Sequence, residues 1–207
     1  MRNIADTGVH AKLNLCCGDD IRNGYVNVDF RRTHPNTIQA DLSQLPWPFA
    51  DESASEILLL DALEHFSWRL TTRILLECFR VLEPGGSLVI QVPAAEQMAH
   101  ALIQEGPYFC NRCPTEMAEC NVIEGGWDNL PACPKCGQSA DDISQQAMQM
   151  LYGGQNYEGN WHATAFTPQS LTLKLSATGF GGFIWEEKEH QEINWAMKIR
   201  AIRGDVW

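Results

Sequence analysis

The sequence has no long apolar run and no tract of basic residues. None of its 207 residues lies in a stretch approaching the roughly 20 apolar residues of a membrane-spanning helix. The opening residues, MRNIADTGVHAKL, lack the apolar segment of a secretory signal peptide. Arg31 and Arg32 form the only adjacent basic pair, which we interpret as part of a solvated loop, and the net charge is −11. We therefore expect a cytoplasmic protein with no membrane partner, and the charge disfavours nucleic acid as a partner.

Paired cysteines occur in a segment that lacks apolar periodicity. Cys110 and Cys113 form one CxxC pair, and Cys133 and Cys136 form a second pair after 19 intervening residues. Two such pairs supply the four thiolates of a tetrahedral structural zinc site, and without a signal sequence zinc is favoured over disulfides. A redox-active CxxC pair is the weaker alternative. Residues 106–139 are therefore predicted to form a four-cysteine zinc ribbon that depends on Zn²⁺ for much of its folding energy.

The rest of the chain has the pattern of an α/β domain. Its hydrophobic content of 44% and charged content of 20% are globular values. Short apolar segments alternate with loops or helices, which predicts a parallel sheet. We expect strands over residues 13–16, 25–30, 37–41, 56–60, 87–92, 180–188 and 193–202. We expect helices over 141–151, over 168–178 with Thr167 as N-cap, and on an apolar face of Leu70, Ile74, Cys78 and Val81 that ends at Pro84-Gly85-Gly86.

The stretch from Leu13 to Asp29 resembles a nucleotide-type site at the ends of adjacent parallel strands. It lacks the complete GxGxxG of a dinucleotide site, and Asp29 follows Gly18 after only eleven residues, too few for a helix and a strand. Asp19 and Asp20 in the loop would also repel a pyrophosphate. A cationic ligand without a pyrophosphate fits better, and S-adenosylmethionine (SAM) is such a ligand.

Five motifs follow in the order and spacing of the class I SAM-dependent methyltransferases. They are LNLCCG, GYVNVD, ADLSQLPWPF, LEHF and RVLEPGG, and they span about residues 12–93. The chain most resembles the type 11 group of this class, whose pattern runs LNLGCG, an acid ending strand 2, D-L-x-x-L-P-F, L-E-H and R-V-L-x-P-G-G. The later segment FTPQSLTLKLSATGF resembles the part of the family that precedes its final strands.

The resemblance implies a Rossmann-like, seven-stranded, mostly parallel sheet with helices on both faces. The methyltransferase domain would comprise residues 1–105 and 140–207, and the zinc ribbon would be inserted after strand 5. Asp29 would accept hydrogen bonds from both ribose hydroxyls, and Asp41 would accept one from the adenine amino group. On this basis the expected SAM-binding residues are Cys16, Gly18, Asp19, Asp29, Phe30, Asp41, Leu42 and Asp61.

The sequence departs from the family pattern at position 16, where glycine is usual. The side chain of Cys16 could crowd the cofactor, or it could be small enough to fit. Asp29 and Asp41 also have a simpler interpretation as polar caps at strand ends. Because both follow apolar strands at the family's spacing, we prefer the binding role.

Methyl transfer from a sulfonium is an in-line displacement, so the protein mainly aligns the acceptor and excludes water. A hydroxyl acceptor also benefits from a general base. The catalytic candidates are His65, His162 and Asp61, although His65 could equally be structural and His162 could equally be a surface residue of the polar loop GGQNYEGNWHATAF.

The acceptor is only weakly specified by the sequence. Asp61-Ala62-Leu63-Glu64 stands after strand 4 in place of the Asn/Asp-Pro-Pro-Tyr/Phe motif of many amino-methylating enzymes, which favours O- or C-methylation of a small molecule or saccharide. Two alternatives stay open: a catalytically inactive binding or scaffold protein with this fold, and a methyltransferase that acts on RNA or protein through the ribbon. A homodimer or a protein partner bound through the ribbon is compatible with each of them.

Overall fold

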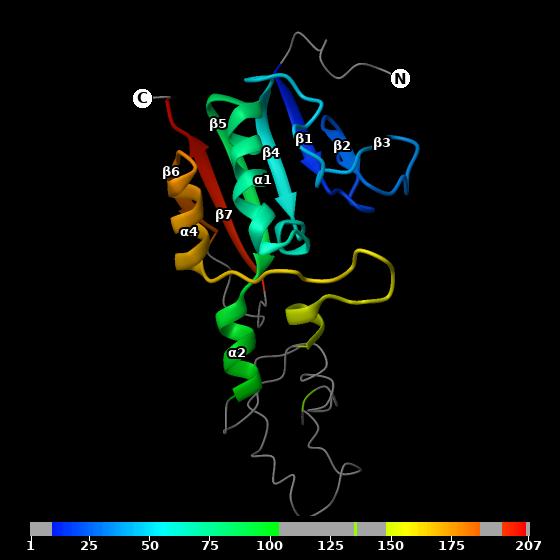
Figure 1. The fold of residues 1–207 in the computed structure, drawn as a ribbon, viewed down its shortest axis with the longest axis vertical. Helices are drawn as coiled ribbons and strands as arrows, with labels where there is room; N and C mark the ends of the chain where they lie inside the picture. Colours follow the sequence, from blue (N-terminus) through cyan, green and yellow to red (C-terminus); the bar gives the residue numbers. More distant parts are fainter. Residues whose placement is uncertain (1–9, 104–134, 136–147, 187–195, 206–207) are drawn as a thin grey trace, which may run out of the picture.

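Seven short segments pair into one sheet in a computed structural model that describes residues 10–103, 135, 148–186 and 196–205 (Figure 1). The strand order is β3-β2-β1-β4-β5-β7-β6. The strands are β1 Ala11–Leu15, β2 Val26–Asp29, β3 Thr37–Gln39, β4 Ala54–Leu60, β5 Leu82–Pro93, β6 Phe180–Trp185 and β7 Ala196–Arg203. Each predicted strand is present, with ends that differ by a few residues.

The sheet is mostly parallel, as predicted. Leu13 of β1 is paired with Val26 of β2 on one side and with Ile57 of β4 on the other, both in parallel register. Only β7 runs antiparallel to its neighbours, β5 and β6. The carboxyl ends of β1, β2 and β4 therefore meet at one edge of the sheet, where ligands bind in open α/β folds.

The clearest predicted helix is α1, Trp68–Val81, which buries Ile74, Leu75, Cys78 and Val81 against the sheet. A single 3₁₀ turn, η2 (Leu63–His65), separates it from β4. At its other end α1 passes directly into β5 at Leu82, so the helix ends before Pro84. The position of η2 matters for function because it places Leu63–His65 at the carboxyl edge of the sheet.

Helix α4, Pro168–Ala177, begins at the predicted cap. The Thr167 hydroxyl oxygen accepts from the Ser170 N–H (3.2 Å), and the Ser170 hydroxyl oxygen accepts from the Thr167 N–H (2.9 Å). This reciprocal capping satisfies two main-chain donors that the helix leaves free. Two further described segments are helical, α2 (Ala95–Ile103) and residues 148–152, the second being part of the predicted 141–151 helix.

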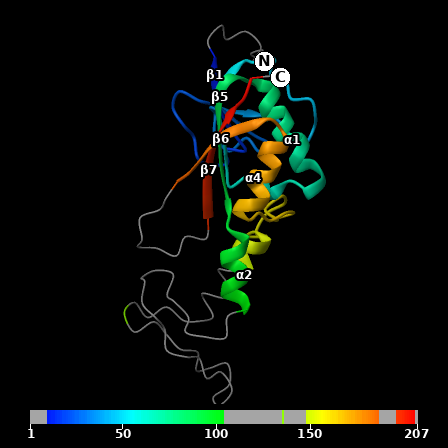
Figure 2. The same ribbon diagram turned by 90° about the vertical axis from the view of Figure 1, so that its left-hand side faces the viewer.

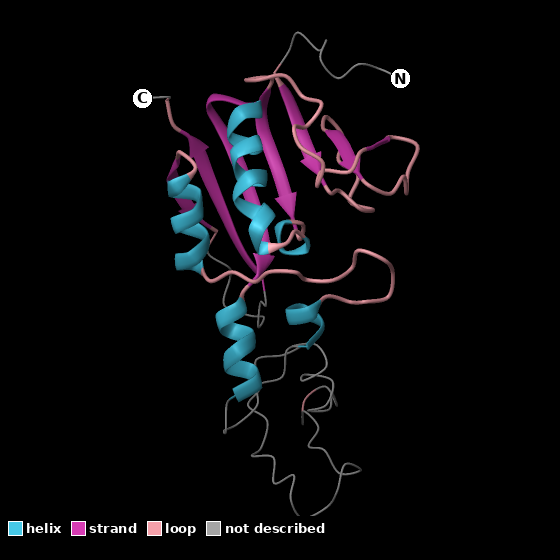
Figure 3. Cartoon of the chain, viewed as in Figure 1, coloured by secondary structure: helices cyan, strands magenta, loops and turns pink. Residues whose placement is uncertain are grey.

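The expectation of helices on both faces of the sheet is wrong for the described residues. Helices α1 and α4 lie on the same face, where their buried side chains share one apolar core with the strands (Figure 2). The connections from β1 to β2 and from β2 to β3 are loops of residues 16–25 and 30–36 (Figure 3). These loops are too short to carry a packed helix across a parallel connection.

The opposite face of the described sheet carries polar side chains instead. Glu56 of β4 accepts hydrogen bonds from the Tyr25 hydroxyl, from Arg200 Nη1 (2.9 Å) and from Ser87 Oγ (3.3 Å). Lys12 lies 3.4 Å from the same carboxylate. Strand residues alternate between faces, so one apolar set packs under the helices, and the other set combines this ion-paired network with the buried side chains of Leu58 and Val89.

The predicted zinc-ribbon segment, residues 106–139, lies outside the described residues except for Lys135. The four predicted zinc ligands, Cys110, Cys113, Cys133 and Cys136, fall in that part of the chain. The described helices include none that is both long enough and apolar enough to cross a membrane.

Candidate active site

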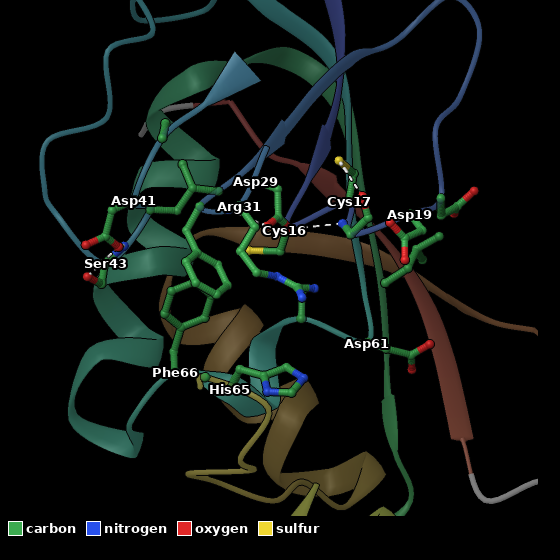
Figure 4. A pocket seen from close by; sticks show the side chains of 18 of the residues that line it. Cys16, Cys17, Asp19, Asp29, Arg31, Asp41, Ser43, Asp61, His65 and Phe66 are labelled. Carbon is green, nitrogen blue, oxygen red and sulfur yellow. Dashed lines mark hydrogen bonds between the residues drawn. The ribbon is translucent and has the colours of Figure 1, made fainter. Parts of the chain in front are cut away.

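A cavity of about 610 Å³ lies at the carboxyl ends of β1, β2 and β4 (Figure 4). Its volume is within the range of sites for small molecules and cofactors. All eight residues predicted to bind SAM line it, as does the catalytic candidate His65: the eight are Cys16, Gly18, Asp19, Asp29, Phe30, Asp41, Leu42 and Asp61. His162 is not among the lining residues and contacts the ring of His65 instead.

Asp29 anchors one end of the cavity, which we call the donor corner. Only 4% of Asp29 is exposed, and its two carboxylate oxygens accept the main-chain N–H groups of Gly18 (2.9 Å) and Arg31 (2.8 Å). A carboxylate has about four lone-pair positions, so each oxygen can accept one further hydrogen bond. The corner is therefore rigid and still able to accept from a pair of hydroxyls.

Cys16 has a left-handed backbone at the start of this corner, with φ of +54°. Only glycine adopts this conformation without steric cost, which explains why the resembled family has glycine at this position. Burial, followed by the charge of Asp29, raises the pKa of the Cys16 thiol, so the side chain is neutral at pH 7. The thiol is thus a small uncharged group in the wall of the cavity.

Asp41 and Asp61 lie at the ends of their strands with different partners. The Asp41 carboxylate accepts from the hydroxyl and the main-chain N–H of Ser43 (2.7 and 2.9 Å), and these hydrogen bonds lower its pKa. Asp61 Oδ2 accepts from Gln91 Nε2 (2.8 Å). Asp41 therefore caps a turn, as its simpler interpretation predicts, while it also faces the cavity.

Arg31 and the loop around Tyr157 are the parts of the site that the sequence did not predict. Arg31 is half-buried instead of solvated, and its guanidinium carbon lies 3.9 Å from the centre of the Tyr157 ring. It reaches from the strand ends toward His65 (Figure 4). Tyr157 and Gly159 also line the cavity, and a Cβ at Gly159 would meet the Phe30 ring at 3.2 Å. No local signal indicates this proximity, because residues 30 and 159 meet only in the folded chain.

The charge in the cavity suits a positively charged ligand. Five aspartates line it against three strongly basic residues: Asp19, Asp20, Asp29, Asp41 and Asp61 against Arg22, Arg31 and Lys198. Asp20 is paired with Arg22 at 2.8 Å. Carboxylates that exceed the available cations favour a ligand with a positive centre, and SAM carries one on its sulfonium.

Glu64 lies at the other end of the site, which we call the histidine wall. It is 1% exposed, and neither carboxylate oxygen has a hydrogen-bond partner. Burial, with a further contribution from the charge of Asp61, raises its pKa to about 8. The Nε2 atom of His162 is 3.9 Å from Glu64 Oε1, and the His65 and His162 rings meet edge to face with centres 4.9 Å apart.

Main-chain hydrogen bonds hold the histidine wall together. The Glu64 carbonyl oxygen accepts from the N–H groups of Ala163 (2.8 Å) and Thr164 (3.1 Å). The segment that carries these residues crosses below the strand ends, yellow in Figure 1. The polar loop is thus fixed beside η2, and it brings two of the three catalytic candidates, His65 and His162, into ring contact. The third, Asp61, lies in the cavity wall.

Comparison with known proteins gives a family match and shared folds. The sequence matches a family described as "Methyltransferase domain" over residues 9–90. No relative among the curated proteins matches the chain.

Similar solved structures come from several organisms. A SAM-dependent methyltransferase from Archaeoglobus fulgidus has a TM-score of 0.54 at 11% identity and covers 95% of this chain and 87% of its own. A SAM-dependent methyltransferase from Methanosarcina mazei has a TM-score of 0.51 at 17% identity. The match covers 95% of this chain and 93% of the Methanosarcina chain. A Thermotoga maritima protein described as a possible histamine N-methyltransferase has a TM-score of 0.52 at 13% identity. The match covers 93% of this chain and 82% of the Thermotoga chain. At these identities the likeness shows the fold alone.

The family match, the shared fold and the cavity at the strand ends together support a SAM-dependent methyltransferase, which is the enzyme class that the motifs predict.

Proposed function

We propose that the chain transfers a methyl group from SAM to a small-molecule or saccharide acceptor, with a hydroxyl oxygen as the favoured methylated atom. The observation that carries this proposal is a cavity that is lined by the carboxylates of the donor corner and also by His65, which belongs to the histidine wall. The donor corner offers carboxylates that suit a sulfonium cofactor, and the histidine wall offers groups that promote loss of a hydroxyl proton.

The residues of the donor corner fit SAM. Asp29 would bind the ribose hydroxyls with its remaining lone pairs, and Asp41 and Leu42 would border the adenine. Gly18 has a left-handed backbone and open space where a side chain would be, so its main chain leaves room for the methionine part. When bound, SAM supplies a methyl group that is already activated, and the protein contributes binding, alignment and exclusion of water.

The size of the cavity supports a small acceptor. About 610 Å³ has to hold both SAM and the reacting part of the acceptor, and sites for single drug-sized ligands already occupy about 300–1,000 Å³. His65 lines the cavity and Asp61 lies in the same wall, so these residues would contact the acceptor, whereas His162 would act on it through His65 or Glu64. The zinc ribbon, a homodimer and a partner bound through the ribbon stay predictions.

The test is a methyl-transfer assay with the full chain. Purified protein is incubated with SAM and a panel of hydroxyl-bearing small molecules and saccharides, and release of S-adenosylhomocysteine is measured. We expect release with a hydroxyl acceptor and none with its deoxy or O-methylated analogue. Binding of S-adenosylhomocysteine by calorimetry serves as the control. Absence of binding at high micromolar concentration would favour the scaffold alternative, and turnover with amines alone would contradict O-methylation.

A further inference from the structure

Glu64, His65 and His162 form a cluster of two imidazoles and one carboxyl group beside the cavity. Glu64 and His65 come from η2, and His162 comes from the loop that crosses the strand ends. One ligand atom from each of the three side chains lies within 4.8 Å of the other two. Two imidazoles and a carboxylate converge here from segments nearly a hundred residues apart.

Both histidines are held in the same protonation pattern. His65 Nδ1 lies 3.0 Å from the Trp161 carbonyl oxygen, and His162 Nδ1 lies 2.7 Å from the Met150 carbonyl oxygen. A carbonyl oxygen can only accept, so Nδ1 is the donating nitrogen of each ring and Nε2 is the nitrogen left for a ligand. Histidines that ligate metals are oriented in this way, with the non-ligating nitrogen donating to a carbonyl or carboxylate.

Glu64 supplies an independent indication of a missing ligand. Its carboxylate is almost fully buried beside the two rings, and neither oxygen accepts a hydrogen bond. Buried carboxylates are normally paired or bound to a metal, so an orphaned one requires an explanation. A bound cation provides that explanation, because it would satisfy the lone pairs that no protein donor reaches.

We propose that Glu64, His65 and His162 bind one divalent transition-metal ion. A metal about 2.0–2.2 Å from each nitrogen or oxygen atom places neighbouring ligand atoms about 3.0–3.4 Å apart. The Glu64 to His162 distance is 3.9 Å and all three ligand atoms lie within 4.8 Å of one another, so the side chains would have to draw closer around a bound ion. Two imidazoles and one carboxylate suit Mn²⁺, Fe²⁺, Co²⁺ or Zn²⁺ better than Mg²⁺ or Ca²⁺, which prefer oxygen ligands.

Three protein ligands leave positions for other oxygen atoms on the ion. His65 lines the cavity, so an ion held by its imidazole would be within reach of an acceptor that enters there. A hydroxyl bound there would lose its proton to water more readily, because the ion stabilises the alkoxide. This role for the ion rests on the proposed function, whereas the metal site itself does not. Such an ion would select acceptors that expose a hydroxyl, or two neighbouring oxygen atoms, at the end that reacts.

Mn²⁺ binding to the full chain tests the proposal. Mn²⁺ prefers nitrogen and oxygen ligands, so it avoids the thiolates predicted at residues 110–136. Protein desalted over a weak chelating resin is titrated with Mn²⁺, and free Mn²⁺ is followed by electron paramagnetic resonance. We expect one saturable site per chain, with affinity at least tenfold lower in Glu64→Gln and in His162→Gln. His34→Gln, which changes an exposed histidine outside the cluster, should bind like the wild type.

Two further readouts make the result decisive. Bound Mn²⁺ should enhance water-proton relaxation, since open positions would hold exchanging water, and circular dichroism checks that each variant is folded. No saturable site in the wild type, or wild-type affinity in a folded Glu64→Gln or His162→Gln variant, overturns the metal site. S-adenosylhomocysteine binding is measured on the same samples. If S-adenosylhomocysteine binds but no Mn²⁺ site is found, the metal proposal alone is overturned. If a Mn²⁺ site is found but S-adenosylhomocysteine does not bind, the proposed function alone is overturned.

Discussion

The candidate site contains two buried carboxyl groups with opposite surroundings: Asp29 lines the cavity, and Glu64 lies in the histidine wall beside it. Asp29 in the donor corner accepts two main-chain N–H groups, whereas Glu64 in the histidine wall accepts none. A carboxylate with fixed donors is part of the scaffold and stays in place whether or not a ligand is present. A buried carboxyl group without donors is costly to ionise, so its pKa is raised to about 8 in the free protein, and a bound cation would stabilise its ionised form. The comparison indicates that the donor corner is preorganised and that the wall is completed by its ligand.

The largest expected effect is on cofactor binding at the donor corner. Asp29→Ala should weaken S-adenosylhomocysteine binding by about 100-fold, because charge-assisted hydrogen bonds contribute about 1.5–3 kcal/mol each. Isothermal calorimetry measures the change, with circular dichroism as the check on folding. Asp41→Ala is the matched variant and should cost less than about tenfold, since Asp41 is exposed and engaged with Ser43. A loss under about threefold in Asp29→Ala would remove Asp29 from the binding role.

Glu56, on the opposite face of the sheet from α1 and α4, is a partly buried carboxylate that has several partners, so it tests whether partners determine the contribution of a carboxylate to stability. Burial raises its pKa, but hydrogen bonds from Tyr25 and Arg200, with the charge of Lys12, outweigh burial and lower the pKa to about 2. A depressed pKa stabilises the fold above the unfolded value of 4.5, and this stabilisation is lost as pH falls toward 2.

Glu56→Gln should therefore lower the free energy of unfolding at pH 7 by about 1–3 kcal/mol. The difference from wild type should shrink as pH falls from about 4.5 toward 2. Urea unfolding at a series of pH values measures it. A difference that stays constant over this pH range would contradict the assigned network.

The smallest expected effect is an increase in the free energy of unfolding, and it tests the contrast between Glu64 and Asp29 most directly. Glu64→Met should raise the free energy of unfolding of the metal-free protein by about 1–2 kcal/mol, because it replaces an orphaned carboxylate with an apolar side chain of similar length. Urea unfolding in a chelating buffer measures the change. Asp29→Leu is the counterpart and should lower stability, since the Gly18 and Arg31 N–H groups lose their acceptor. If both variants raised the free energy of unfolding, or both lowered it, the contrast between Glu64 and Asp29 would be contradicted.

The gathering of the donor-corner residues at one cavity could be predicted from the sequence because each of them lies at or just after the end of a strand. Strand ends carry Asp29, Asp41 and Asp61, and a parallel sheet gathers such ends at one edge. The same patterns located α1, α4 and the Thr167 cap. The incomplete glycine motif of the corner also has a structural counterpart, since Cys16 has a left-handed backbone, which glycine adopts without steric cost.

The histidine wall could not be predicted in the same way. The burial of Glu64 depends on a single 3₁₀ turn, which has no periodicity to mark its inner side, and His162 reaches His65 only through long-range packing. The interpretation of Arg31 as solvated was wrong because its ring partner, Tyr157, lies on a distant loop. The expectation of a second layer of helices was wrong for the described residues because the connections of residues 16–25 and 30–36 are too short to carry a packed helix.

The main chain and the side chain of Glu64 have separate roles. Its main-chain carbonyl holds the loop through Ala163 and Thr164, while its side chain alone faces the histidines. Any L-amino acid compatible with the turn offers the same carbonyl. The identity of the side chain can therefore change while the loop keeps its anchor, so this position can be redesigned to accept a different ion, or none, within an unchanged backbone.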